Sequence, residues 1–426
     1  MSNPVRIQPD LQFVKDLQQV GGDTLKRCYQ CATCSVACPI SPAVNPYPRK
    51  EMIWAQWGLK DKLVNDIDIW LCHNCGTCSD LCPRGAKPGD LLAALRNMAY
   101  RKVAEPTIIG EWMSKPKHLP LLIAIPAIIW LVVWIIRAGM LGSFFPMFEP
   151  AADGHGWQVV AEGGKVIYGG LFPGDFTIDP IFMATFFAMV FVFYRSVKKL
   201  ITSFDVPKTF VLSGEKNPSM FEAFKATIAC EIATHTKWKK CGDDTEADKQ
   251  KFMGHFTLFY AFIALMIVTG TIAATHWGSN FLRWFTGLEL GILKFFGHTP
   301  LNLWNPLKLL AIFGAVLFVY GLAKLTARRM RQDTSKHGSS WYDWYLLGII
   351  WVVGLSGIFC MLLRLANTPT LAYPMYFVHL VSVWMLFAYL PWSKLGHLVY
   401  RTAALTYARH VGRIPMETKE EKTFVL

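Results

Sequence analysis

Charged residues are scarce in this chain. Asp, Glu, Lys and Arg make up 17% of its 426 residues, whereas hydrophobic residues make up 53%; a soluble globular domain usually carries about 25% charged residues. Residues 1–10 contain no apolar stretch that would serve as a signal peptide. No Cys-x-x-Cys-His motif occurs, so covalently attached haem of the c type is not expected.

The scarcity of charge is confined to one part of the chain. Residues 1–118 are charged and rich in cysteine, as in a soluble domain, whereas residues 119–426 contain long apolar runs. Runs of about 20 apolar residues are long enough to cross a bilayer as helices. The sequence therefore predicts six transmembrane helices, at 119–139, 177–197, 252–277, 303–325, 343–364 and 371–393.

The distribution of lysine and arginine predicts the orientation in the membrane. Of the 43 Lys and Arg residues, only five fall in the connections on one side: Arg137, Lys165, Arg283, Lys294 and Arg364. Because basic residues favour the cytoplasmic side, we expect a multi-pass protein of the cytoplasmic (inner) membrane with both termini and residues 1–118 in the cytoplasm. The formal charge of +13 is then a topology signal, and no nucleic-acid partner is expected.

Eight of the eleven cysteines form two copies of one motif. Cys28, Cys31, Cys34 and Cys38 follow a C-x2-C-x2-C-x3-C-P spacing, and Cys72, Cys75, Cys78 and Cys82 repeat it. This spacing is typical of [4Fe–4S] clusters, and in two-cluster proteins the fourth cysteine ligates the other cluster. We therefore expect one cluster on Cys28, Cys31, Cys34 and Cys82, and a second on Cys72, Cys75, Cys78 and Cys38.

Two other interpretations of these cysteines fit less well. Structural zinc sites use two short cysteine pairs, not a run that ends in Cys-Pro. Disulfides need an oxidising compartment, which the missing signal peptide argues against. The remaining cysteines, Cys230, Cys241 and Cys360, are expected to be ordinary thiols.

The cysteine-rich part is predicted to be helical. Pro88-Gly89-Asp90 opens an amphipathic helix with Leu91, Leu92 and Leu95, and no segment shows strand alternation. The expected fold is all-α: an α-helical two-cluster ferredoxin domain (1–118), followed by a six-helix transmembrane cytochrome b bundle (119–426).

Four histidines near the ends of two apolar runs suggest haem. His255 and His276 are 21 residues apart on the third run, and His379 and His397 are 18 apart at the sixth. At about 1.5 Å per residue, the members of each pair lie roughly 30 Å apart along their helix. Since the helices run in opposite directions, His255 pairs with His397 on the cytoplasmic side, and His276 with His379 on the outer side. Such pairs are axial ligands of b-type haem. His298 could replace His276, and without haem the four would be ordinary interfacial histidines.

Several stretches resemble a known family. They are Arg27–Cys34, Pro48–Leu59, Trp70–Cys78 and Cys82–Ala86. Together they are similar to the C subunit of the quinone-interacting membrane-bound oxidoreductase complex. In that family a domain similar to the C subunit of heterodisulfide reductase is fused to a membrane part similar to the cytochrome b of the same enzyme and to the gamma subunit of respiratory nitrate reductase.

The resemblance implies a function and partners. It implies two cubane clusters, a dihaem with four histidine ligands, and a site for quinone (menaquinone or ubiquinone). It implies an electron-transfer subunit of a quinone-dependent oxidoreductase complex, with partners like the A subunit of heterodisulfide reductase, which carry flavin and clusters, and adenylylsulfate reductase as the enzyme served. In the nitrate reductase relative the two ligands on the first haem-bearing helix lie closer than His255 and His276. The alternatives are a subunit of another heterodisulfide-reductase-like complex and a membrane anchor without haem.

Overall fold

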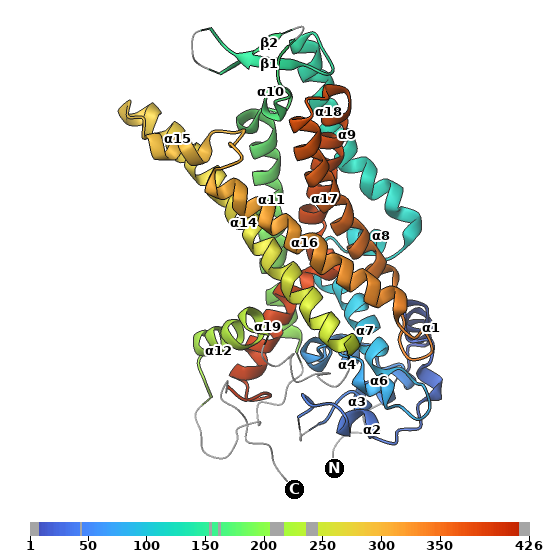
Figure 1. Cartoon of the computed structure of the whole chain (residues 1–426). Helices are drawn as coiled ribbons and strands as arrows, with labels where there is room; N and C mark the ends of the chain where they lie inside the picture. The colour runs from blue at the N-terminus through green and yellow to red at the C-terminus, as the bar shows by residue number, and fades with distance from the viewer. Residues whose placement is uncertain are drawn as a thin grey trace.

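The protein is all-α, as the sequence predicts. The computed structural model describes residues 8–42, 45–152, 156–160, 163–204, 217–235 and 246–416. Figure 1 shows a compact group of short helices at one end and a bundle of long helices rising from it. Among the described residues, strands form a single antiparallel pair, β1 (Met147–Pro150) and β2 (Trp157–Val160), at the far end of the bundle. Cys241 lies outside the described residues.

The N-terminal part packs short helices around one long helix, α7 (Pro88–Val103). Pro88 occupies the first turn of α7, where proline is well tolerated, and Leu91, Leu92 and Leu95 are buried. The predicted amphipathic helix is thus confirmed. The other helices are α1 (Leu11–Val20), α2 (Thr33–Val36), α3 (Arg49–Gln56), α4 (Lys60–Val64), α5 (Asp68–Leu71), α6 (Thr77–Asp80) and α8 (Thr107–Met113).

Within the residues that the structure describes, six helices are long and apolar enough to cross a membrane, as predicted. Many of their apolar side chains face outward: Ile128 is 61% exposed and Met266 68%. Such exposure suits contact with lipid, which solvates apolar side chains. The six are α9 (Leu119–Leu141), α11 (Asp179–Ser203), α14 (Glu246–Thr286), α16 (Pro306–Arg331), α17 (Trp341–Leu365) and α18 (Pro369–Ala388).

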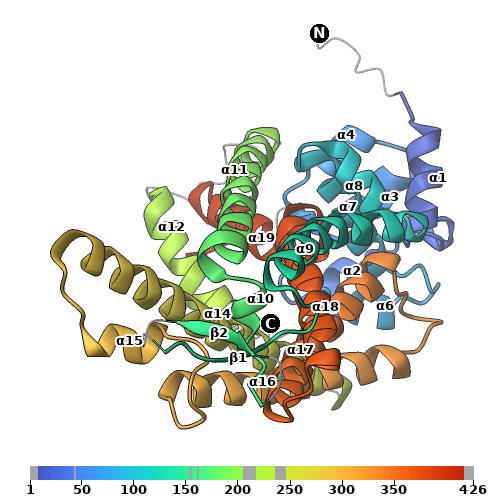
Figure 2. The ribbon, with the colours of Figure 1, turned by 90° about the horizontal axis from the view of Figure 1, so that it is seen from above.

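Helices α14 and α16 lie side by side along the bundle (Figures 1 and 2). Two glycines explain how closely they approach. A Cβ atom added to Gly321 of α16 would lie 2.7 Å from the carbonyl oxygen of Gly254 on α14. Small residues at a crossing let two membrane helices come this close. The contact fixes α14, which carries His255 and His276.

One prediction about the last span is wrong. The span 371–393 is predicted to place His379 and His397 at the two ends of one helix, but α18 ends at Ala388. Two 3-10 turns follow, and the first contains Pro391, which cannot continue the helical hydrogen bonds. His397 instead begins a separate helix, α19 (His397–His410), which packs against α5, α11 and α12 (Met220–Thr227).

Candidate functional site

The two cysteine runs fold into loops of the same backbone shape. Gln30 and Ala32 of the first run have φ angles of 62° and 69°, and Asn74 and Gly76 have angles of 54° and 102° at the matching places in the second. Each loop then enters a one-turn helix, α2 or α6, which carries the third cysteine. These left-handed turns let the first three cysteines of each run line one cavity.

Each cavity also receives the last cysteine of the other run. One cavity is lined by Cys82 together with the first three cysteines of the Cys28 run; we call it the Cys28 cavity. A second cavity, the Cys72 cavity, is lined by Cys38 together with the first three cysteines of the Cys72 run. The structure therefore brings together the same sets of four sulfurs that the motif predicts.

The chemistry of the converging thiols suits a metal cluster. Burial raises the pKa of Cys34 to about 11, and the nearby thiols of Cys28 and Cys82 act in the same direction. Burial raises the pKa of Cys38 to about 12, and Cys72 and Cys75 also raise it. Thiolates this close to one another need a positive centre, which ligated iron provides. Four sulfurs around one cavity fit a [4Fe–4S] cluster.

Donors of hydrogen bonds to sulfur occur in both loops. The backbone N–H of Asn74 donates to Sγ of Cys72 at 3.3 Å, and that of Ala86 donates to Sγ of Cys82 at 3.3 Å. The side-chain amide of Gln30 donates to Sγ of Cys28 at 3.4 Å. Hydrogen bonds to the sulfurs stabilise thiolate charge and raise the reduction potential of a bound cluster.

The Cys72 cavity lies beneath a loop of the membrane part. This loop joins α16 to α17, and its His337 Nε2 lies 3.0 Å from Oδ1 of Asp80 on α6. The backbone N–H of Gly338 donates to Asp90 at 2.6 Å. A Cβ atom on Gly76 would lie 2.6 Å from His337 Cε1. The second cysteine loop is thus packed directly against the membrane part.

Two cations from membrane-part helices also bind the second cysteine loop. Arg401 of α19 donates from Nε to the Trp70 carbonyl at 3.1 Å, and its Nη2 lies 3.1 Å from Nδ1 of His73. Lys251 of α14 donates to the Asn74 carbonyl. Burial lowers the pKa of Arg401. These two cations hold the cysteine loop against α14 and α19.

His255 and His397 come together in the structure. Their ring centres lie 6.4 Å apart, with the ring planes at 63°. Two imidazoles bound to one metal, each through a bond of about 2 Å, have ring centres about 6 Å apart. A third ring, that of His235, lies 5.2 Å from His255. The spacing of His255 and His397 therefore suits axial ligation of one haem.

The hydrogen bond of His397 favours ligation. Its Nδ1 lies 2.7 Å from the Lys394 carbonyl, which can only accept, so Nδ1 carries the proton. Burial lowers the pKa of His397 to about 4, which keeps the ring neutral. A neutral ring protonated at Nδ1 leaves its Nε2 lone pair for a metal.

His379 has the same arrangement within the membrane. Its Nδ1 lies 2.9 Å from the Ser356 hydroxyl, and that hydroxyl itself donates to the Val353 carbonyl. The hydroxyl oxygen therefore accepts from Nδ1–H of His379, and Nε2 keeps its lone pair. Two of the predicted ligands thus have second partners of the kind that metal-ligating histidines use.

The structure does not bring His276 to His379. His276 Nε2 lies 2.6 Å from Oδ1 of Asp175, and no hydrogen bond or ring contact joins His379 to His276 or His298 among the described residues. Helix α15 (Gly291–Gly297) packs on α14 here, since a Cβ atom on Gly297 would lie 2.6 Å from the backbone nitrogen of His276. Both candidates for the outer ligand therefore lie in the same region.

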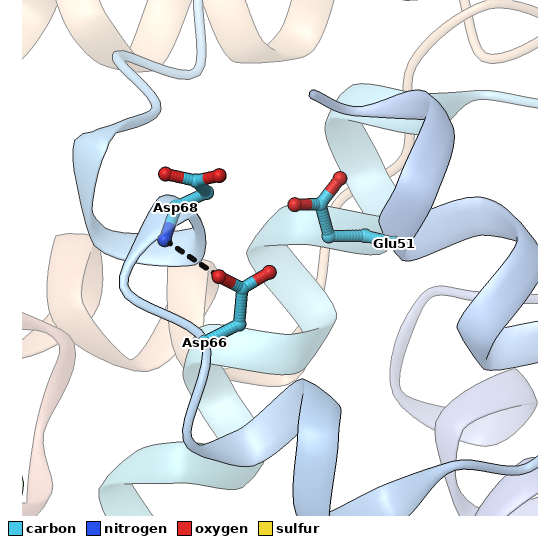
Figure 3. A group of neighbouring side chains, drawn as sticks. All are labelled: Glu51, Asp66 and Asp68. Carbon is cyan, nitrogen blue, oxygen red and sulfur yellow. Dashed lines mark hydrogen bonds between the residues drawn. The ribbon is translucent and has the colours of Figure 1, made fainter. Parts of the chain in front are cut away.

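A group of three buried carboxylates lies in the N-terminal part. Oxygens of Glu51, Asp66 and Asp68 lie within 4.8 Å of one another (Figure 3). The Lys50 ammonium lies 3.4, 3.0 and 2.6 Å from their oxygens, and Arg413 of the C-terminal segment lies 2.6 Å from Asp68. Lys50 therefore already supplies the cation that a metal ion would supply, and we assign this group a structural role.

Glu51 is the least satisfied member of this group. Neither of its carboxylate oxygens accepts a hydrogen bond from the part of the chain that the structure describes, and its side chain is fully buried. Burial, followed by the charge of Asp66, raises its pKa well above the usual value. Because an unfolded Glu has a pKa of about 4.3, folding retains a proton on Glu51 above that pH. The stability that this proton contributes is lost as pH rises through the folded pKa.

We expect Glu51→Gln to flatten the dependence of stability on pH. The group that retains this proton is then absent. The free energy of unfolding should therefore fall less steeply with pH, by up to about 1.4 kcal/mol per pH unit, beginning above pH ~4.3. Thermal unfolding in detergent at several pH values between 5 and 9 measures this, with the exposed Glu111→Gln as control. Parallel curves for wild type and Glu51→Gln would contradict the assignment.

Three residues around the His255–His397 pair and the second cysteine loop are not predicted from the sequence: Lys251, Arg401 and His235. A signal for two of them is present. Lys251 precedes His255 by four residues and Arg401 follows His397 by four, so each lies one helical turn from a candidate ligand. His235 has a positive φ angle of 52° and has no comparable spacing.

Comparison with known families identifies the N-terminal part. Residues 24–86, which contain both cysteine runs, match the family described as 4Fe-4S dicluster domain. The C subunit of the H(2):CoB-CoM heterodisulfide,ferredoxin reductase of Methanothermobacter marburgensis is 38% identical over 113 residues, covering 26% of this chain and 60% of that protein. The iron-sulfur C subunit of the CoB--CoM heterodisulfide reductase of Methanopyrus kandleri is 38% identical over 79 residues, 18% of this chain and 41% of that protein.

A further relative is a different component. The E subunit of the dihydromethanophenazine:CoB--CoM heterodisulfide reductase of Methanosarcina acetivorans is 28% identical over 158 residues, 35% of this chain and 56% of that protein. The chain thus spans 60% or less of the length of these three relatives. No solved structure matches. The N-terminal part is an iron–sulfur dicluster domain like the C subunit of heterodisulfide reductase, and the six apolar helices fit a membrane cytochrome b-like fusion.

Proposed function

We propose that this chain is the membrane electron-transfer subunit of a quinone-dependent oxidoreductase complex. Two [4Fe–4S] clusters and two b-type haems, when bound, supply the one-electron chemistry. The cluster ligands are the two exchanged sets, Cys28, Cys31, Cys34 and Cys82, and Cys72, Cys75, Cys78 and Cys38. The haem ligands are His255 with His397 on the cytoplasmic side, and His379 with His276 on the outer side, with His298 as the alternative to His276.

One observation carries this proposal: the paired histidines are tied to the second cysteine loop. His255 lies one turn from Lys251 on α14, and His397 lies one turn from Arg401 on α19. Both cations donate to carbonyls of the segment 70–74, which contains Cys72. One helical turn is about 5.4 Å. The chain thus places its candidate haem ligands and its Cys72 cavity next to each other, as electron transfer between them requires.

The orientation follows from the charge distribution. We place the iron–sulfur domain and both termini in the cytoplasm, because basic residues favour that side. Helix α16 ends with Arg328, Arg329 and Arg331, near the iron–sulfur domain, which supports the same orientation. The outer histidines then lie near the opposite face of the cytoplasmic membrane.

The electron donor and the partners are inferred from likeness. A relative named for dihydromethanophenazine and a heterodisulfide supports a reduced ring compound as donor, and the resemblance favours quinol from the membrane pool. The resemblance also favours partners like the A subunit of heterodisulfide reductase, with adenylylsulfate reductase as the enzyme served. The relatives named as components of heterodisulfide reductases support a second candidate, a role in another complex of that type with a different terminal acceptor.

The function is tested at Arg401. We expect Arg401→Gln to keep its haem and cluster content but to slow quinol-driven reduction of the clusters by about 10- to 100-fold, the usual cost of losing a supporting contact around a metal ligand. Stopped-flow spectra of the haem bands, with freeze-quenched electron paramagnetic resonance for the clusters, measure the two steps separately.

Two controls make this test specific. Arg401→Lys keeps the positive charge but loses the planar guanidinium group and its several N–H donors. We therefore expect a rate of cluster reduction between those of wild type and Arg401→Gln. Arg195→Gln removes an exposed arginine of α11 and should leave the rate unchanged. A wild-type protein that binds no haem would favour the anchor interpretation, and an Arg401→Gln variant as fast as wild type would reject the proposed contact.

A further inference from the structure

The two cysteine cavities differ in what covers them. The Cys72 cavity is covered by His337, Lys251 and Arg401 of the membrane part. Helix α2, whose Cys34 lines the Cys28 cavity, lies at the end of the molecule opposite the β-hairpin (Figure 1). Its Cys31 is exposed, whereas Cys72 and Cys78 of the other cavity are buried. The Cys28 cavity is therefore the one that a soluble protein can approach.

The rim of the Cys28 cavity is basic. Arg49 and Arg84 line the cavity, and Lys26 and Arg27 lie just before Cys28. All four are exposed, and none forms an ion pair with a carboxylate within the part of the chain that the structure describes. Two exposed acidic residues lie close in sequence: Asp23, three residues before Lys26, and Asp80, two residues before Cys82, which contacts His337. The rim therefore presents an excess of unneutralised positive charge.

Exposed apolar side chains lie close in sequence to cysteines of the Cys28 cavity, with Val36 two residues after Cys34 and Leu81 next to Cys82. Tyr29 is 68% exposed, Val36 is 86% and Leu81 is 55%. Arg84 lies 4.2 Å over the ring of Tyr29 and donates to its hydroxyl at 2.8 Å, which holds both side chains in place. Apolar and aromatic residues surrounded by arginine are typical of protein–protein interfaces.

We infer that this face, the basic rim of the Cys28 cavity, docks a soluble redox protein through an acidic surface. The inference rests on the proposed function and adds the chemistry of the partner. Complementary charge raises the rate of encounter, and the apolar residues supply contact area close to Cys31. A lipid surface is a poor occupant, because the face lies at the end away from the spans.

The test uses the full-length protein in detergent with its clusters reduced by light and deazaflavin, so that neither quinol nor haem is needed. Two soluble oxidants of opposite charge serve as probes: plastocyanin, which is acidic, and cytochrome c, which is basic. We expect wild type to react faster with plastocyanin, with a rate that falls as salt rises. We expect Arg49→Glu/Arg84→Glu to slow plastocyanin and to accelerate cytochrome c, each by about tenfold or more.

Three controls separate docking from other effects. Lys26→Glu/Arg27→Glu changes the rim without touching Arg49 and Arg84, in case those residues are needed for cluster assembly. Lys15→Glu/Lys117→Glu makes the same change in net charge elsewhere and should alter neither rate. Cluster potentials are measured for every variant. Rates that shift in the same direction with both probes, together with the potential, would show that the rim only tunes the cluster. Rates indifferent to charge and salt would also overturn the inference, whereas a wild type without clusters would overturn the proposed function itself.

Discussion

His255→Ala and His397→Ala are expected to remove the same haem. Each imidazole would supply one of the two axial bonds, so the loss of either empties or converts that site and leaves the other haem in place. We expect the haem content to fall by about half in each variant, with the same remaining spectrum. Reduced-minus-oxidised spectra and pyridine haemochrome content of the purified protein measure this.

The complementary result is expected for the outer site. His379→Ala should remove the haem that His255→Ala keeps, since His379 holds its proton on Nδ1 toward Ser356 and offers Nε2. Comparison of His276→Ala with His298→Ala then identifies the second outer ligand. If His276→Ala kept both haems and His298→Ala lost the outer one, the second outer ligand would be His298.

Two variants serve as controls for this pairing. His235→Ala changes the ring next to His255 without removing a proposed ligand, and we expect it to keep both haems with a shifted potential. Ser356→Ala removes the partner of His379 Nδ1 and should weaken the outer haem without emptying it. If His255→Ala and His379→Ala gave the same spectrum, the pairing would be wrong.

The fold is predictable because its determinants are local. A run of about 20 apolar residues identifies a span without knowledge of its neighbours, and the count of six follows from that alone. The end of α18 is not predicted, because Pro391 and the first 3-10 turn, Leu390–Trp392, lie inside a segment that remains apolar. The composition of such a segment predicts how long its apolar run is. It does not predict where the helix ends, because the helix ends where its hydrogen bonds are interrupted.

The site is predictable only in part. The cysteine spacing names all eight sulfurs, because three of each four come from one short loop. The contact of Arg401 with His73 joins residues 328 apart in sequence, and no periodicity encodes such a pair. The position of His276 also depends on tertiary structure, since Asp175 comes from a separate segment, 101 residues earlier.

Cys38→Ala and Cys82→Ala are expected to damage the cluster of the opposite run. Cys38 lines the Cys72 cavity and Cys82 lines the Cys28 cavity, so each substitution removes one of four sulfurs from the other loop's site. We expect each variant to lose about four of the eight iron atoms that the two clusters would hold, with haem iron counted separately, or to convert one cubane to a three-iron form. Iron analysis and electron paramagnetic resonance of the dithionite-reduced protein measure both outcomes.

The identity of the damaged cluster is decided by two reference variants. Cys31→Ala and Cys75→Ala each remove a cysteine that belongs to its own run under any assignment, so their spectra define the loss of each cluster. Exchange of the fourth cysteine then requires that Cys38→Ala match Cys75→Ala and that Cys82→Ala match Cys31→Ala. Arg401, one helical turn from His397, donates to the Trp70 carbonyl two residues before Cys72, so Cys38→Ala should also block quinol-driven reduction of the remaining cluster, whereas Cys82→Ala should leave the Cys72 cluster reducible. The opposite match, Cys38→Ala with Cys31→Ala, would show that each run ligates its own cluster.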